Sequence, residues 1–135
     1  MALTIRSEVL PVRTQEDVVQ VRQRVRAIAT EEGFKLVDQT KIVTAASEIA
    51  RNTFIYGGGG TARVETVENN GRRGIRVVFE DSGPGIADLD LAMKDGYTTG
   101  GGLGLGLSGA RRLSNDFELR SQPGEGTLVA ITRWK

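Results

Sequence analysis

The stretch TARVETVENNGRRGIRVVFE, residues 61–80, contains two alternating, β-branched runs on either side of a turn-forming segment. TARVETV at 61–67 and GIRVVFE at 74–80 have the period of two that is typical of strands with one buried face. The intervening NNGRR favours a reversal of the chain. We therefore predict an antiparallel hairpin in the middle of the chain.

The segments before this hairpin predict one strand and two helices. Residues 3–12 form an alternating run, after which Thr14 and Asp17 resemble a helix capping box. The first helix is expected to continue to about residue 31 and to end before Gly33. A second amphipathic helix is expected from about Val37 to Tyr56, because apolar residues recur along it at helical spacing. The run of four glycines at 57–60 is expected to end it.

The segments after the hairpin predict a loop, a third helix and two more strands. A glycine-rich loop is expected from Asp81 to Gly102, with a short helix possible at 89–96. The third helix is expected from Leu103 to Asn115, followed by strands at 117–121 and 127–134. The order β-α-α-β-β-α-β-β places strands in neighbouring pairs, which indicates an α+β fold with a mixed, mainly antiparallel sheet and helices on one face.

Composition limits the chemistry that the chain can perform. The 135 residues are 39% hydrophobic, which fits a single domain spanning 1–135. A formal charge of +1 and the lack of a long apolar run predict no nucleic-acid or membrane partner and a cytoplasmic protein. Histidine and cysteine are both absent, so catalysis would have to use carboxylates, backbone amides and a hard cation.

Four short motifs could carry that chemistry. EIARN places Glu48 and Asn52 one helical turn apart, although such a polar pair is more often a solvated face. DSGPG at 81–85 and PGEGT at 123–127 could each be an ordinary tight turn. GGGLGLG at 100–106 leads into the third helix, where free amides can bind phosphate oxygens. It matches neither the GxGxxG dinucleotide motif nor a P-loop.

Taken together and in this order, the four motifs resemble the nucleotide-binding boxes of the GHKL ATPase and kinase superfamily. AASEIARNTFIYGG, EDSGPGI, DGYTTGGGLGLGLSGARRL and GEGT resemble in particular the RsbT-type switch kinases of bacterial stressosomes. Anti-sigma kinases of the RsbW and SpoIIAB type usually have a histidine where this chain has Tyr56. Sensor histidine kinases place an asparagine where it has Glu48.

The resemblance implies a Bergerat-type, two-layer α/β sandwich that binds ATP and Mg²⁺. It implies that Glu48 is the catalytic general base, that Asn52 holds Mg²⁺ and that Asp81 accepts a hydrogen bond from the adenine amino group. Residues from about 88 to 101 would form a lid over the nucleotide. The implied nucleotide-binding residues are Asn52, Asp81, Gly83, Gly85, Gly102, Leu103, Gly104, Gly106 and Thr127.

The resemblance further implies a serine/threonine protein kinase in stress-response signal transduction. Its substrates would be STAS-domain proteins of a stressosome, and once released it would activate a PP2C-type phosphatase. One alternative is a nucleotide-gated, anti-sigma-type binding protein with little phosphotransfer. Another is an ATPase or the detached catalytic module of a histidine kinase. The arginines at 22, 24 and 26 are a weak indication of a partner-binding face, since most such runs are solvated.

Overall fold

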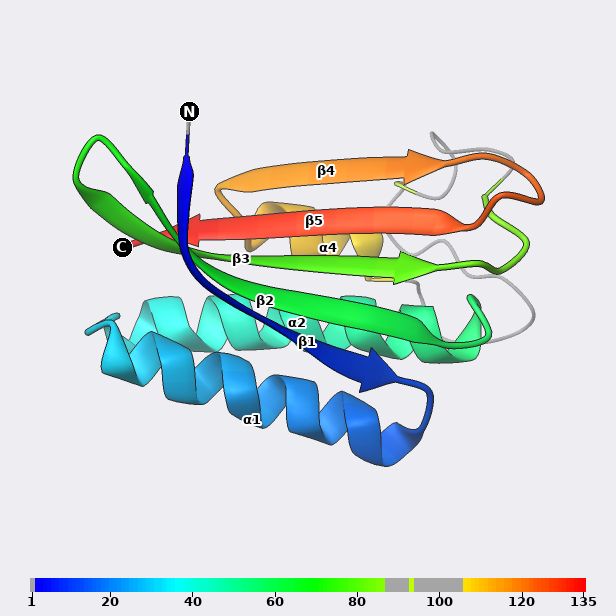
Figure 1. The fold of residues 1–135 in the computed structure, drawn as a ribbon, viewed down its shortest axis with the longest axis horizontal. Coiled ribbons are helices and arrows are strands. Elements are labelled where there is room, and N and C mark those ends of the chain that lie inside the picture. The colour runs from blue at the N-terminus through cyan, green and yellow to red at the C-terminus, as the bar shows by residue number, and fades with distance from the viewer. Residues whose placement is uncertain (1, 87–92, 94–105) are drawn as a thin grey trace.

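The computed structural model describes residues 2–86, 93 and 106–135, which fold into one sheet and a layer of helices (Figure 1). This arrangement and the order of elements confirm the predicted α+β sandwich with helices on one face. The elements are β1 (Leu3–Val12), α1 (Gln15–Glu31), α2 (Leu36–Ile55), β2 (Gly60–Asn69), β3 (Arg72–Asp81), α4 (Leu107–Arg112), β4 (Asp116–Ser121) and β5 (Thr127–Trp134).

The sheet has five strands in the order β1-β2-β3-β5-β4, and every neighbouring pair is antiparallel. The predicted hairpin is β2 and β3, with both strands longer than expected. Asn70 and Gly71 have φ angles of 53° and 80°, as a two-residue turn of the type that suits twisted hairpins requires. Since β5 inserts between β3 and β4, residues from three separate chain segments meet in the sheet.

The core lies between the sheet and the helices. Every second side chain of β3 points toward the helices. These buried side chains, each at most 1% exposed, are Ile75, Val77 and Phe79. Val21 and Val25 of α1 are fully buried in the same cluster. No helix in the described parts of the chain is both long enough and apolar enough to cross a membrane.

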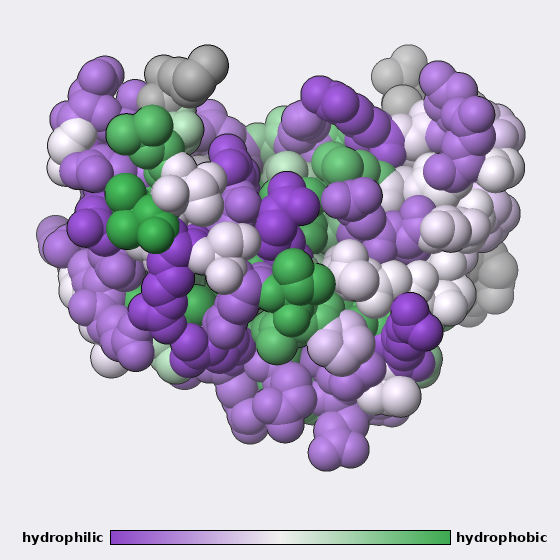
Figure 2. All heavy atoms as spheres, in the orientation of Figure 1, coloured by the Kyte–Doolittle hydropathy of each residue, from purple (hydrophilic) through white to green (hydrophobic). Residues whose placement is uncertain are grey.

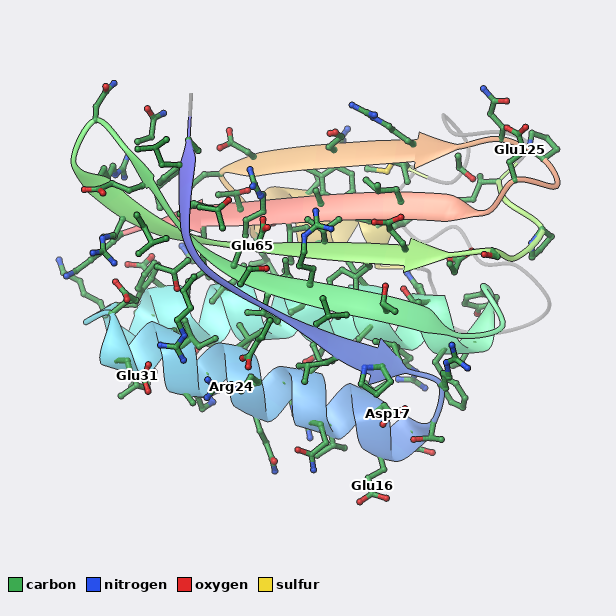
Figure 3. The ribbon with its side chains drawn as sticks, viewed as in Figure 1. Glu16, Asp17, Arg24, Glu31, Glu65 and Glu125 are labelled. Carbon is green, nitrogen blue, oxygen red and sulfur yellow. The ribbon has the colours of Figure 1, made fainter. Side chains whose placement is uncertain are left out.

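The opposite face of the sheet is mainly polar. Glu65 of β2, labelled in Figure 3, accepts hydrogen bonds from Arg76 Nε at 2.7 Å and Arg63 Nε at 3.1 Å. Its side chain is only 7% exposed. The space-filling view shows hydrophilic side chains around smaller hydrophobic areas on the face presented (Figure 2). The buried carboxylate is stable there because two guanidinium groups pair with it and satisfy both of its oxygens.

The first helix begins with the predicted capping box. The Asp17 backbone N–H donates to Thr14 Oγ1 at 3.0 Å, and the Thr14 N–H donates to Asp17 Oδ2 at 3.2 Å. Of the three arginines in the helix, Arg24 pairs with Glu8 of β1, whereas Arg22 and Arg26 are exposed. The capping box satisfies N–H groups that have no partner within the helix.

The third helix is shorter than predicted. Residues 103–105 lie outside the described residues, and α4 begins at Leu107 after Gly106, whose φ is 72°. The predicted end at Asn115 is wrong, because the helix stops at Arg112. The Asn115 N–H instead donates to the Thr132 carbonyl at 2.8 Å and joins the chain to β5. Sheet pairing therefore overrides helix propensity at this end.

Candidate functional site

Glu48 and Asn52 lie one turn apart on α2, as predicted, and both are half-buried. A Cβ atom at Gly106 would lie 2.5 Å from Glu48 Oε2, so the glutamate contacts the start of α4 directly. The structure thus brings together a carboxylate and a glycine that are 58 positions apart in the sequence. Only a residue without a side chain leaves room for this contact.

A second group forms where three neighbouring strands end. Asp81 of β3 pairs in register with Thr127 of β5, which pairs with Ser121 of β4. We call Asp81, Ser121 and Thr127 the strand-end cluster. Paired residues in adjacent strands point to the same face of a sheet, so these three side chains share one side. Figure 1 shows the ends of β3 and β4, the start of β5 and the end of α2 at one end of the molecule.

Ser121 organises this cluster through several hydrogen bonds. Its hydroxyl donates to the Gly126 carbonyl at 2.9 Å, lies 2.9 Å from Thr127 Oγ1 and accepts from the Ile86 N–H at 2.8 Å. Asp81 Oδ1 accepts from the Gly83 N–H at 2.9 Å. Sequence reasoning missed Ser121, although the predicted strands at 117–121 and 127–134 could have indicated that it pairs with Thr127.

Glycines allow the surrounding backbone to approach closely. A Cβ atom at Gly57 would lie 2.3 Å from Asp81 Oδ2, and one at Gly83 would lie 2.6 Å from the Gly57 carbonyl oxygen. A Cβ atom at Gly85, whose φ is 76°, would lie 2.1 Å from the Gln122 carbonyl oxygen. Gly57 was expected only to end the second helix, yet it also makes room for the Asp81 carboxylate. The glycines of DSGPG therefore permit packing of the protein against itself.

A hollow of about 500 Å³ borders the strand-end cluster. Its lining includes all three cluster residues together with Glu80, Arg120, Gln122, Glu125, Gly126 and Leu128. Glu80 pairs with Leu128, and each is the chain neighbour of one member of the Asp81–Thr127 pair. Because side chains alternate along a strand, Glu80 and Leu128 point to the opposite face of the sheet. The hollow therefore extends around the end of the sheet from the cluster.

The described residues contain no group of three or more His, Cys, Asp or Glu side chains that could hold a metal ion. The oxygen of the half-buried Asn52 amide is nevertheless a suitable ligand for a hard cation. Since Mg²⁺ commonly takes one or two protein ligands and completes its shell with substrate phosphates and water, Asn52 fits a site of that kind.

Several predicted residues cannot be placed in this site. Gly102, Leu103 and Gly104 lie outside the described residues, as do the possible helix at 89–96 and the lid at 88–101, apart from Met93. Met93 is partly buried against the core. Among the predicted positions that are described, Glu48 meets Gly106, and Asp81 meets Gly83 and pairs with Thr127.

Known proteins resemble this chain in sequence and in fold. Residues 37–134 match the family model of histidine kinase-, DNA gyrase B- and HSP90-like ATPases. The chain is also 46% identical over 123 residues to the serine/threonine-protein kinase RsbT of Bacillus subtilis strain 168, covering 91% of this chain and 92% of that protein. The chain belongs to the RsbT-type branch of this ATPase family.

Three further proteins resemble this RsbT-type chain less closely. An anti-sigma F factor of Thermoanaerobacter strain X514 is 30% identical over 118 residues, covering 84% of this chain and 82% of that protein. The RsbU and RsbW domains of Rv1364c from Mycobacterium tuberculosis align with a TM-score of 0.65 and 20% identity, over 100% of this chain and 33% of that one. The SiaB–SiaC complex of Pseudomonas aeruginosa gives a TM-score of 0.52 and 15% identity, over 98% and 91% of the two chains. These two structures share the fold.

Proposed function

We propose that this protein is an ATP-dependent serine/threonine protein kinase of a partner-switching pathway. The observation that carries the proposal is the 46% identity to a serine/threonine-protein kinase over 91% of the chain. The match to an ATPase family model over residues 37–134 supports the use of ATP.

The strand-end cluster would bind the adenine base. Asp81 would accept a hydrogen bond from the exocyclic amino group of adenine, and Thr127 would support that acceptor from the neighbouring strand. Guanine carries a carbonyl oxygen at the same position, so a carboxylate there would repel it. Gly83 and Gly85 would shape the loop beside the base, because they let it pack closely against Gly57 and Gln122. Ser121 would hold Thr127 and the loop at 122–126 in place. Its hydrogen bonds to Gly126 and Thr127 support this role.

The other end of the site would bind the phosphates. Backbone N–H groups around Gly102, Leu103, Gly104 and Gly106 would donate to phosphate oxygens. Asn52 would hold Mg²⁺, which neutralises phosphate charge during phosphoryl transfer.

Glu48 would act as the general base. Its carboxylate would accept the proton of the serine or threonine hydroxyl while that oxygen bonds to the γ-phosphorus and ADP leaves. The contact with Gly106 supports this role, because it places the carboxylate beside a backbone segment assigned to the phosphates. Such a mechanism requires neither histidine nor cysteine, which the chain lacks.

The acceptors would be STAS-domain proteins of a cytoplasmic stressosome. After release from them, the kinase would activate a PP2C-type phosphatase. A relative named as an anti-sigma F factor, at 30% identity, supports a pathway in which the chain binds protein partners. Neither nucleic acid nor membrane is required as a partner.

The test is phosphate transfer from γ-labelled ATP, in the presence of Mg²⁺, to a purified STAS-domain protein from the same organism. Acid-stable label on a serine or threonine is the expected result. Glu48→Ala should lower the transfer rate by about 10² to 10⁴ while leaving ATP binding intact, because loss of a general base typically has this effect. Glu16→Ala is the control, since Glu16 is an exposed glutamate in the first turn of α1 (Figure 3) and belongs to none of the four motifs.

A second candidate function is a nucleotide-gated binding protein that transfers little phosphate. The anti-sigma F factor relatives at 30% identity favour it. Tight ATP binding and partner binding without acid-stable label would support this candidate and contradict the kinase. An unchanged transfer rate for Glu48→Ala would contradict the assignment of the base alone.

A further inference from the structure

Helix α2 has one side that no other element in the described part of the chain covers. Its buried residues, including Ile42, Ala46 and Ile49, face the sheet, while α1 and α4 pack along it. The exposed residues recur at spacings that bring them to one remaining face. We call this face the outer stripe of α2; it consists of Val37, Thr40, Thr44, Arg51 and Ile55.

Arg51 and Ile55 lie at the end of the outer stripe nearest the candidate site. Arg51 is three positions after Glu48 and directly precedes Asn52, and side chains three or four positions apart in a helix are neighbours. A surface that contacts both Arg51 and Ile55 would therefore also reach Glu48 from the solvent side.

Arg51 has a charge that the described residues do not neutralise. None of their carboxylates lies within 4.0 Å of its guanidinium group, whereas Arg24, Arg76 and Arg133 each form an ion pair. Glu48, the nearest acidic residue in the sequence, is in contact with Gly106. The guanidinium group is therefore available to a carboxylate from another molecule, which it can bind through two parallel hydrogen bonds.

Ile55 adds an apolar contact one turn further along. It is 50% exposed, although it follows the buried Thr53 and lies at the end of a well-packed helix. Ile55 thus offers an apolar contact beside an arginine that has no ion pair among the described residues, and arginine is enriched among the residues that carry most of the affinity in protein interfaces.

We propose that Arg51 and Ile55 dock the acceptor protein and select it. The acceptor would present a carboxylate to Arg51 and an apolar side chain to Ile55, on the same surface as the serine or threonine that receives phosphate. This inference rests on the proposed kinase function, because it assigns the substrate contact of the same site. Docking within one turn of Glu48 would hold the acceptor hydroxyl near the base, which raises the effective concentration of the reacting groups.

The test compares steady-state phosphorylation of the STAS-domain acceptor by wild type, Arg51→Gln, Arg51→Glu and Ile55→Ser. Arg51→Gln removes the charge without placing a second carboxylate beside Glu48. We expect each variant to raise KM for the acceptor by about tenfold, with the largest increase for Arg51→Glu, and kcat for Arg51→Gln to stay close to wild type. The Kd for ATP, measured by calorimetry, should be unchanged in all of them.

Arg26→Gln and Arg26→Glu are the matched controls, because Arg26 is also an exposed helical arginine but lies on α1. A further arm replaces single surface aspartates and glutamates of the acceptor by lysine. One such acceptor should be phosphorylated better by Arg51→Glu than by wild type, because its lysine would pair with the new glutamate.

The possible outcomes distinguish this inference from the function on which it rests. If wild type phosphorylates the acceptor and the Arg51 and Ile55 variants do so with an unchanged KM, the docking surface is wrong and the kinase stands. Equal losses for the Arg26 and Arg51 variants would also overturn the docking surface, since they would show a general charge effect. If wild type transfers no phosphate to STAS-domain proteins, the proposed function fails and this inference fails with it.

Discussion

Replacing Gly57 by alanine should disturb the proposed adenine site through a single atom. The new methyl carbon would lie 2.3 Å from Asp81 Oδ2 and 2.4 Å from Asp81 Cγ. Ordinary contact begins near 3.4 Å, so the carboxylate would have to move by the difference, about 1 Å. That movement would take the Asp81 oxygens away from the position where adenine is expected.

The size of the effect follows from the hydrogen bond that would be lost. A hydrogen bond to a charged group contributes about 1.5 to 3 kcal/mol, and about 1.4 kcal/mol corresponds to a tenfold change in Kd. Gly57→Ala should therefore weaken ATP binding by roughly 10- to 100-fold in calorimetry. Gly109→Ala is the matched control: among the described residues outside its own helix, no atom lies within 4 Å of an added Cβ, and ATP binding should not change.

A double-mutant cycle with Asp81→Ala separates this cause from general damage to the fold. Asp81→Ala removes the two nearest atoms, Oδ2 and Cγ, and leaves the Cβ of residue 81 at 2.8 Å from the new methyl carbon. In that background Gly57→Ala should weaken ATP binding by less than about threefold, because the group that it displaces is absent. Equal effects of Gly57→Ala in both backgrounds, or wild-type affinity in the folded single variant, would refute the reasoning.

Two further substitutions test how the site is held together. Ser121→Ala should lower the free energy of unfolding by about 1 to 3 kcal/mol, because it leaves half-buried partners unsatisfied, and should also weaken ATP binding; a melt with and without ATP measures both effects. Arg133→Met should lower the free energy of unfolding by a similar amount, because Arg133 donates to Asp38 Oδ1 at 2.9 Å and to the Leu113 carbonyl at 3.2 Å with its side chain 15% exposed. Arg120→Met is its control and should change the free energy of unfolding by less than about 1 kcal/mol, because the ion pair of Arg120 with Glu118 is 76% exposed at the arginine. Equal losses for the two variants would contradict the role given to Arg133.

Elements with local signals were predicted well. The capping box at Thr14 and Asp17 and the turn at Asn70 and Gly71 depend on residues a few positions apart, so their chemistry is visible in the sequence. The predicted end of the third helix was wrong because the true end depends on a residue that is distant in the sequence. Asn115 bonds to the Thr132 carbonyl of β5, a partner that local propensity cannot reveal.

The candidate site was predicted in part. The amphipathic pattern predicted the helix on which Glu48 and Asn52 lie one turn apart. The four motifs indicated a nucleotide site without showing how the motifs meet. Ser121 was missed because its role depends on its pairing with Thr127 across two strands. The second role of Gly57 was missed because its neighbour, Asp81, is 24 positions away in the sequence.

The sequence by itself determined the class of fold, the order of the elements and the residue types available for chemistry. Periodicity, turn residues and composition are short-range properties that a chain has before it folds. Only the tertiary structure decided that β5 lies between β3 and β4 and that Glu48 meets Gly106. Those contacts depend on which strands and helices can bury their apolar faces together, which is a property of the whole chain and not of any one segment.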